Sequence, residues 1–197
     1  MRKFIVGGWV RDLLLENNPK DKDWVVVGSS VEEMKENGFN TVAGKSFPVF
    51  IHPETGDEWA LARKENLVPI EELDASREDV ENEDLFEFKT DSSVTLEEDL
   101  VRRDLTINAM AIAEEDVAPP EEMDLDSVTI HDPFNGREDI KNKTLRHVSE
   151  AFSEDPLRVL RIGKFLSRLP EFTVAEETID IARETAPKLQ YVHNQRF

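Results

Sequence analysis

The spacing of apolar residues along the chain changes once, near residue 150. Before that position, short runs of β-branched and aromatic residues alternate with turn residues, which predicts strands interleaved with short helices. After that position, apolar residues recur every three or four positions, which predicts helices. The pattern therefore predicts an α+β domain at residues 1–148, followed by a helical segment at residues 149–197.

The first region carries the signals of a small mixed sheet flanked by helices. Residues 106–113 fit either a helix or a strand. Clearer signals place strands at residues 3–6, 23–27, 47–51 and 58–62, and helices at residues 9–16, 31–37 and 96–103.

In the second region, a helix is expected from a cap at Ser153 to about Leu169, with Glu154 and Asp155 in its first turn, where the helix dipole favours acidic residues. A further helix is expected at residues 175–186. In the first of these helices, the residues expected to pack inward are Val159, Ile162, Leu166 and Leu169, and those expected to form a basic stripe on a neighbouring face are Arg158, Arg161, Lys164 and Arg168.

Acidic residues dominate the charge of the chain. There are 43 Asp and Glu against 24 Lys and Arg, a formal net charge of −19. This balance disfavours general, high-affinity binding of nucleic acid, because phosphate contacts come mainly from basic side chains. Much of the acid falls into two segments, which we interpret as a flexible acidic loop at residues 65–95 and an acidic insertion at residues 114–127. A basic groove elsewhere stays compatible with the charge.

Several kinds of site and location are disfavoured by composition. Cysteine is absent, so disulfides, thiolate metal sites and cysteine nucleophiles are excluded, and any metal must bind to oxygen or imidazole ligands. No apolar run approaches the roughly 18 residues of a membrane span, and the apolar stretch at the start is too short for a signal peptide. We therefore expect no membrane partner and a cytoplasmic location.

Asp21 and Asp23 are the first candidates for chemistry. In an extended segment, residues i and i+2 point to the same side, so both carboxylates can face one cation. Magnesium prefers hard oxygen ligands and commonly takes one or two carboxylates together with substrate phosphates. The alternative is a solvated acidic turn before a strand.

A glycine pair, Gly7-Gly8, stands directly after a predicted strand and directly before a predicted helix. Free backbone N–H groups at such a turn can receive phosphate groups, and Arg11 can add a charge-assisted contact. The segment is neither a P-loop nor a dinucleotide fingerprint, because the required lysine and third glycine are missing. An ordinary strand-to-helix turn is the alternative.

Together, the glycine pair with Arg11-Asp12 and the Asp21-x-Asp23 segment resemble the bacterial CCA-adding tRNA nucleotidyltransferase and poly(A) polymerase family, the class II branch of the polymerase-β-like superfamily. The resemblance extends through collinear motifs as far as residue 161. These motifs are FPVF at 47–50, EWALAR at 58–63, LEEDL at 96–100, RRDLTINA at 102–109, DPFNG at 132–136, RHV at 146–148 and EDPLRVLR at 154–161.

The resemblance implies a polymerase-β-like nucleotidyltransferase head at residues 1–148 and a helical neck segment at residues 149–197. In the head, it implies that Asp21 and Asp23 bind Mg²⁺ and that Gly8, Arg11 and Arg103 contact a nucleotide. For Arg103, the alternative is a structural salt bridge to Asp104 or Asp99.

Glu58 resembles the third acidic position of the superfamily site. There it would activate the attacking hydroxyl or join the metal shell, although a surface glutamate is the alternative.

In the neck, the resemblance implies that Asp155 and Arg158 read the base edge of CTP or ATP, with help from Arg161. At the next basic position the family usually has arginine and this chain has Lys164, which keeps the charge and loses the bidentate geometry. The alternative for the whole stripe is a solvated amphipathic face.

The expected activity is transfer of a nucleotide from CTP or ATP to an RNA 3′ end, the acceptor being tRNA, with addition of CCA or part of it. Two features depart from the family: the acidic loop is longer than in relatives, and the chain ends at Phe197, about where relatives continue into helical domains that hold tRNA. Whether the sequence is cut or naturally minimal, we expect weak RNA binding or a partner protein, and the oligomeric state is left open. The alternatives are a protein or small-molecule acceptor, and a non-catalytic nucleotide-binding module.

Overall fold

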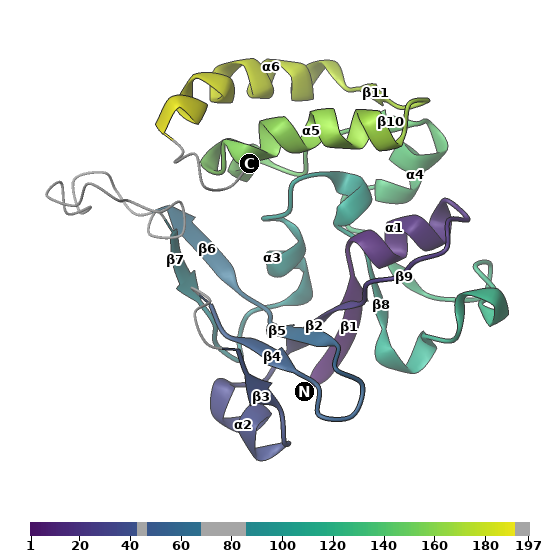
Figure 1. Ribbon diagram of the computed structural model, residues 1–197, viewed down its shortest axis with the longest axis vertical. Helices are drawn as coiled ribbons and strands as arrows, with labels where there is room; N and C mark the ends of the chain where they lie inside the picture. The colour runs from purple at the N-terminus through teal and green to yellow at the C-terminus, as the bar shows by residue number, and fades with distance from the viewer. Residues whose placement is uncertain (43–46, 68–85, 192–197) are drawn as a thin grey trace, which may run out of the picture.

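The computed structural model describes residues 1–42, 47–67 and 86–191, with side chains also left undescribed at residues 65–67, 86–89 and 191. Within these ranges the chain forms a mixed sheet, short helices around it, and a pair of longer helices at one end (Figure 1). The predicted α+β class is therefore confirmed. No helix in the described ranges is both long and apolar enough to span a bilayer.

The central sheet has the strand order β3-β4-β5-β2-β1-β8-β9. Only the pairing of β2 with β5 is parallel, which aligns Asp23 with Glu58 at the start of both strands. The sheet strands are β1 (Arg2–Val6), β2 (Asp23–Val27), β3 (Asn40–Thr41), β4 (Val49–Ile51), β5 (Glu58–Leu61), β8 (Ala111–Ala113) and β9 (Ile130–His131).

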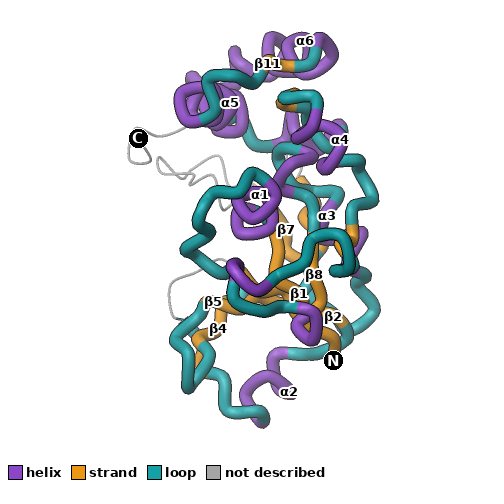
Figure 2. The backbone as a smooth tube through the Cα atoms, turned by 90° about the vertical axis from the view of Figure 1, so that its right-hand side faces the viewer, coloured by secondary structure: helices purple, strands orange, loops and turns teal. Residues whose placement is uncertain are grey.

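Figures 1 and 2 show α5 and α6 together at one end of the molecule, beyond α1 and α4. A short parallel pair, β10 (Thr144–Leu145) with β11 (Thr173–Val174), ties this end to the rest of the chain. The helices are α1 (Gly8–Leu14), α2 (Val31–Glu36), α3 (Leu96–Leu100), α4 (Gly136–Lys141), α5 (Leu157–Arg168) and α6 (Glu176–Thr185).

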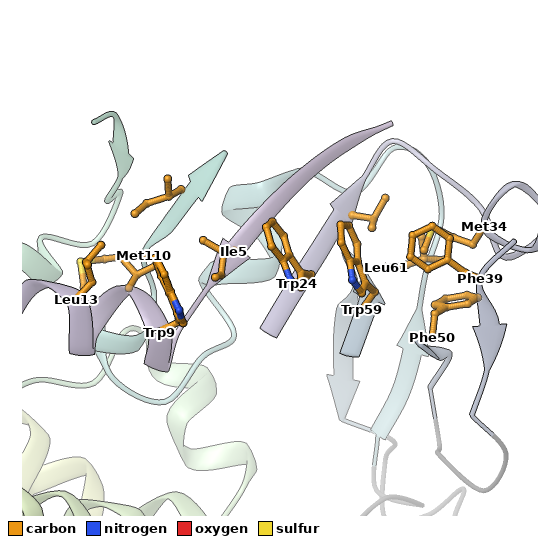
Figure 3. Close-up of a cluster of buried hydrophobic side chains, with 13 residues drawn as sticks. Ile5, Trp9, Leu13, Trp24, Met34, Phe39, Phe50, Trp59, Leu61 and Met110 are labelled. Carbon is orange, nitrogen blue, oxygen red and sulfur yellow. The ribbon is translucent and has the colours of Figure 1, made fainter. Parts of the chain in front are cut away.

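Two apolar layers cover the two faces of the sheet, because alternate side chains of a strand point to opposite faces. On one face, the rings of Trp24 and Trp59 stack with centroids 4.7 Å apart, in a row that runs from Trp9 to Phe50 (Figure 3). On the other face, Val25 and its neighbours pack against α3. The sheet end that carries Asp23 is thereby held from both sides.

A third apolar cluster joins the helical end to the sheet domain. It combines Leu105 and Ile107 with Phe152, Ile162 and other residues of the helical segment. The two regions therefore share a core across the predicted boundary at residue 148, and the position of that boundary stays a prediction.

The helix predicted from Ser153 begins later, at Leu157. Residues Glu150–Glu154 form a 3-10 turn instead, and Ser153 donates its hydroxyl to the Glu150 carbonyl rather than capping the helix. The reason is Pro156, which disfavours helical geometry at the residue before it; Asp155 is extended, with φ −110° and ψ 102°. Of the residues predicted to face inward, Ile162 and Leu169 are buried, whereas Val159 and Leu166 are only partly buried.

The interpretation of residues 65–95 as a loop is wrong at residues 65–67 and 86–89, where strand β6 (Lys64–Leu67) pairs antiparallel with β7 (Phe86–Lys89). Residues 90–95 contain neither helix nor strand, and the helix predicted at residues 96–103 is α3, which ends at Leu100. Residues 68–85 lie outside the described residues. The acidic insertion contains 3-10 turns at Glu114–Asp116 and Pro120–Glu122, and its apolar residues Val117, Met123 and Leu125 pack on the core.

Gly136, at the start of α4, is packed so closely that its substitution should change the stability of the fold. Gly136 follows Asn135, which is left-handed at φ 60°, and a Cβ at Gly136 would overlap the Thr106 carbonyl oxygen and touch Met110 Sδ. We predict that Gly136→Ala lowers the free energy of unfolding by about 1–3 kcal/mol, the usual cost of overpacking.

The matched control is Gly163→Ala in α5, where a Cβ meets nothing within 4 Å. There the exchange should stabilise the helix by about 0.5–1 kcal/mol, since alanine is the better helix former. Urea unfolding of both variants checks the pair, and effects of equal sign would contradict the packing.

Candidate active site

The site lies in a cavity of about 550 Å³ at the sheet end where β1 finishes and β2 and β5 begin. Its walls come from the Gly7-Gly8 turn, from the segment after α3, and from the start of α5. Eight sequence-predicted site residues line it, and they are Gly8, Arg11, Asp23, Glu58, Arg103, Asp155, Arg158 and Arg161. Asp21 and Lys164 do not line it.

Asp23 and Glu58 stand side by side at the floor of the cavity, as partners in the β2–β5 register. Burial within the concave surface raises the pKa of Asp23 although the side chain still reaches solvent; Arg103 lowers that pKa, and the charges of Glu58 and Asp21 raise it. Three carboxylates therefore act on one another at this point, which is an electrostatically unfavourable arrangement in the absence of a cation.

This donor set fits a hard divalent cation. Asp21 is exposed just before β2, within electrostatic reach of Asp23. No group of three or more His, Asp or Glu side chains in the described part of the chain is placed to hold a metal by itself. Two carboxylates with further oxygens from a substrate are what magnesium commonly uses, so the residues present fit Mg²⁺ with a bound triphosphate.

Arg103 reaches the cavity from the segment after α3. Its Nη2 donates to Asp99 Oδ2 at 3.3 Å, and its Nε is buried with no partner among the described residues. Its Nη1 lies 2.9 Å from where a Cβ of residue 7 would stand, and Gly7 has φ +71°, so only glycine fits there. The salt bridge to Asp99 that stood as the alternative is thus present, and the same guanidinium also faces the cavity.

Asp99 is a fully buried carboxylate that organises the arginines of this wall. Its Oδ1 accepts from Arg102 Nη2 at 2.8 Å and from the Arg63 backbone N–H at 3.2 Å. Burial raises the pKa of Asp99, and the neighbouring Arg102 and Arg103 outweigh that effect and hold the pKa below its usual value. A permanent negative charge therefore fixes the direction of these guanidinium groups.

A hydrogen-bonded chain joins the sheet domain to the helical segment across the cavity. Arg11 Nη1 donates to Asn108 Oδ1 at 2.7 Å, and Asn108 Nδ2 donates to Asp104 Oδ1 at 3.0 Å. The other oxygen, Asp104 Oδ2, accepts from Arg161 Nε at 2.7 Å. Burial raises the pKa of Asp104, and the charge of Arg161, together with hydrogen bonds from Asn108, Arg161 and the Leu105 N–H, outweighs it and holds that pKa below its usual value.

Asp104 and Asp99 were expected only as alternative salt-bridge partners of Arg103, and Asn108 was not predicted as a site residue. All three belong to the motifs LEEDL and RRDLTINA, which carry the family resemblance, so the motif match could have indicated them as site residues. Some of their contacts are local, since Asp99 pairs with Arg102 and Arg103 three and four positions away, and Asp104 with Asn108 four positions away. The contacts of Asn108 with Arg11 and of Asp104 with Arg161 join residues distant in the chain, and spacing alone does not reveal those.

The predicted site residues of the helical segment differ in their position and exposure. Asp155 and Arg158 both line the cavity, and Asp155 Oδ1 also accepts from the Leu157 N–H at 3.0 Å at the start of α5. Arg158 is only 8% exposed, and it donates to the carbonyls of Ala151 and Arg102, each at 2.7 Å. The predicted basic stripe is therefore wrong at Arg158, which turns inward, whereas Lys164 and Arg168 are exposed.

Comparison with known proteins finds relatives that match most of this chain. The family model described as the poly A polymerase head domain matches residues 3–146. The multifunctional CCA protein of Pseudoalteromonas atlantica is 50% identical over 180 residues, which are 90% of this chain and 38% of that protein. The corresponding protein of Aromatoleum aromaticum is 48% identical over 183 residues, 93% of this chain and 39% of that protein. This chain spans about two fifths of the length of these relatives.

Solved structures that resemble this chain are also of nucleotidyltransferases. A CCA-adding enzyme of Bacillus stearothermophilus in complex with CTP has a TM-score of 0.69 and 29% identity, covering 97% of this chain and 41% of that one. A tRNA nucleotidyltransferase complexed with a primer tRNA and an incoming ATP analogue has a TM-score of 0.64 and 31% identity, covering 98% and 49%. The resemblance drawn from the motifs is confirmed, and the chain belongs to the poly A polymerase head domain family of nucleotidyltransferases.

Proposed function

We propose that this chain transfers a nucleotide from CTP or ATP to the 3′ hydroxyl of an RNA, the end of a tRNA, adding CCA or part of it. The observation that carries the proposal is one cavity with paired carboxylates at its floor, a glycine turn with Arg11 and Arg103 beside it, and Asp155 and Arg158 at its neck wall. The relatives named as CCA proteins support the choice of reaction.

The proposed roles follow from charge and position. Arg11 and Arg103 bind the triphosphate, because they are the cationic groups nearest the glycine turn. Asp155 and Arg158 select the base through acceptor and donor groups. Arg161 is linked to Arg11 by hydrogen bonds through Asp104 and Asn108. These bonds hold the base-binding and phosphate-binding sides of the cavity at a fixed separation.

In the reaction, the RNA O3′ forms a bond to the α-phosphorus while the bond from that phosphorus to the bridging oxygen breaks and pyrophosphate leaves. The hydroxyl proton passes to a floor carboxylate, and we assign this role to Glu58, which lies beside Asp23 in the β2–β5 register. Mg²⁺, which Asp21 and Asp23 would hold, supplies positive charge that stabilises the attacking and leaving oxygens. A cytoplasmic location belongs to the same proposal, since nucleoside triphosphates and RNA are available there.

A second candidate keeps the nucleotidyl transfer and replaces the acceptor by a protein hydroxyl or a small molecule. The net charge of −19 favours it, because an acidic protein attracts RNA poorly. Intact-mass measurement of candidate acceptors after incubation with CTP or ATP separates it from RNA extension.

The activity is tested with a tRNA that lacks its terminal CCA, labelled CTP or ATP, and Mg²⁺. We predict extension of the RNA by the 197-residue chain and a loss of at least about 100-fold for Asp23→Asn, the scale of removing one electrostatic group from a site. Asp126→Asn, an exposed acid of the insertion, is the matched control and should keep full activity. Failure to extend any RNA at any enzyme concentration would sink the proposal.

The crowding of carboxylates predicts a stability effect of the same substitution. Because the folded-state pKa of Asp23 is raised above its ordinary 3.8, ionisation of Asp23 destabilises the fold as pH rises. Asp23→Asn should therefore raise the Tm at pH 7, and the gain should vanish at a pH low enough to protonate the parent Asp23. Thermal unfolding in metal-free buffer across pH measures it, and a Tm below that of the parent at pH 7 would contradict the electrostatic account.

The link through Asn108 predicts that Asn108→Asp is harmful. The new carboxylate loses the donor to Asp104 and repels that carboxylate in a buried place, so unfolding should become about 1–3 kcal/mol easier. Affinity for CTP should fall as well, because the hydrogen bond between residue 108 and Asp104, which links Arg11 to Arg161, is replaced by repulsion.

Asn142→Asp is the matched control, since Asn142 Nδ2 donates to Glu138 Oε1 at 2.9 Å on the exposed side of α4. It should change neither property appreciably. Chemical unfolding and equilibrium dialysis with CTP measure both variants, and equal behaviour of the two would remove Asn108 from the proposed mechanism.

A further inference from the structure

Helix α5 is the most basic element among those described. Leu157–Arg168 contains four basic residues and no acidic residue, in a chain whose net charge is −19. Arg158 is buried and donates to backbone carbonyls, so it adds nothing to the outer face. Arg161, Lys164 and Arg168 are exposed, and their spacing of three and four residues places them on one side of the helix.

Two of these three cations have no ion-pair partner within the described part of the chain. Arg161 is paired with Asp104. Lys164 and Arg168 make no ion pair with any residue in the ranges 1–42, 47–67 and 86–191. The outer face of α5 therefore presents unneutralised positive charge on a protein that is otherwise strongly acidic.

A hollow of about 290 Å³ lies between α1 and α5, beside this charge. It is lined by Arg11, Asp12, Asn17, Phe165, Arg168 and Leu169. The carboxylate of Asp12 is already neutralised by Arg11, whose Nε and Nη2 lie 2.9 and 2.8 Å from Asp12 Oδ1. The hollow thus keeps the positive charge of Arg168 at its rim.

The hollow continues the nucleotide cavity. Arg11 lines both spaces, and the Phe165 ring lies under the guanidinium groups of Arg11 and Arg161, whose Cζ atoms are 5.3 and 6.0 Å from the ring centroid. Both views show α1 below the end of the molecule formed by α5 and α6 (Figures 1 and 2). A polymer whose end occupies the cavity can therefore leave it along α5.

We propose that the α1–α5 hollow, with Lys164 and Arg168, binds the phosphodiester backbone of the RNA acceptor just upstream of its 3′ end. This inference rests on the proposed function, which requires an RNA end at the carboxylate floor. A polyanion approaching a chain of net charge −19 is repelled over most of the surface, so its contacts concentrate where cations are unpaired. Lys164 is then an RNA contact and not a nucleotide contact.

The test uses the double variant Lys164→Ala/Arg168→Ala in the 197-residue chain. Fluorescence anisotropy with a labelled tRNA lacking CCA, repeated at several salt concentrations, gives the RNA affinity and its salt slope. For single-stranded RNA each lost phosphate contact lowers the slope by about 0.7, so the pair should lower it by about 1.4 and weaken binding severalfold at low salt. Affinity for CTP, measured by equilibrium dialysis, should stay unchanged.

The matched control is Lys141→Ala/Arg183→Ala, which removes one exposed lysine and one exposed arginine with side chains 76% and 75% accessible. It should leave the RNA affinity and salt slope close to those of the parent. The charge-preserving pair Lys164→Arg/Arg168→Lys should also retain binding, which separates a loss of charge from a loss of folding.

Equal RNA affinity and equal salt slope for the test and control variants would overturn the inference. A loss of CTP affinity in Lys164→Ala would overturn it too, since that result places the lysine at the nucleotide. Failure of the proposed function is a separate outcome: the parent would then extend no RNA, while a dependence of RNA binding on Lys164 and Arg168 would still support the surface.

Discussion

The buried carboxylate of Asp104 is the interaction on which the arrangement of the site depends. It accepts hydrogen bonds from Asn108 on the sheet side and from Arg161 on α5, so a single ionised group joins the head to the helical segment. Removing one partner of a buried charge pair leaves an uncompensated charge, which costs about 3–5 kcal/mol. The apolar cluster around Leu105, Phe152 and Ile162 holds the same junction closed. The cavity wall built from α5 therefore keeps its distance from the carboxylate floor.

The electrostatics of the cavity follow a simple division. Carboxylates repel one another at the floor, where burial and the charges of Glu58 and Asp21 raise the pKa of Asp23. Guanidinium groups gather on the walls, held by the buried carboxylates of Asp99 and Asp104. A ligand that combines a divalent cation with several phosphates is complementary to both parts. The overall charge of −19 says little about such a site, because the arginines are concentrated where the substrate would lie.

Glycine geometry makes the close approach of these elements possible. Gly7 has a positive φ and leaves the space that Arg103 Nη1 occupies, so the Gly7-Gly8 turn and the arginine wall can meet. Gly136 lets α4 pack directly on the Thr106 carbonyl, which supports the short 3-10 turn Thr106–Asn108 that carries Asn108. Backbone contacts of this kind fix side chains more firmly than surface loops do, and they explain why a small domain can hold a precise polar network.

The sequence by itself determined the local elements and the family. A run of β-branched residues predicted the strand at Asp23–Val27, and the motif series contains most of the residues that line the cavity. The tertiary structure decided which groups meet. Asp23 and Glu58 are neighbours because β2 pairs in parallel with β5. Arg158 turns inward because it shares the buried face of α5 with Ile162 and Phe165, where the carbonyls of Ala151 and Arg102 accept its hydrogen bonds. The ladder of β6 with β7 was missed although Phe86–Lys89 alternates apolar and polar residues, because the strand is short and stands in a strongly acidic segment. The periodicity of apolar residues indicates which face of one segment is buried. Pairing between distant segments depends on tertiary packing, which no single segment encodes.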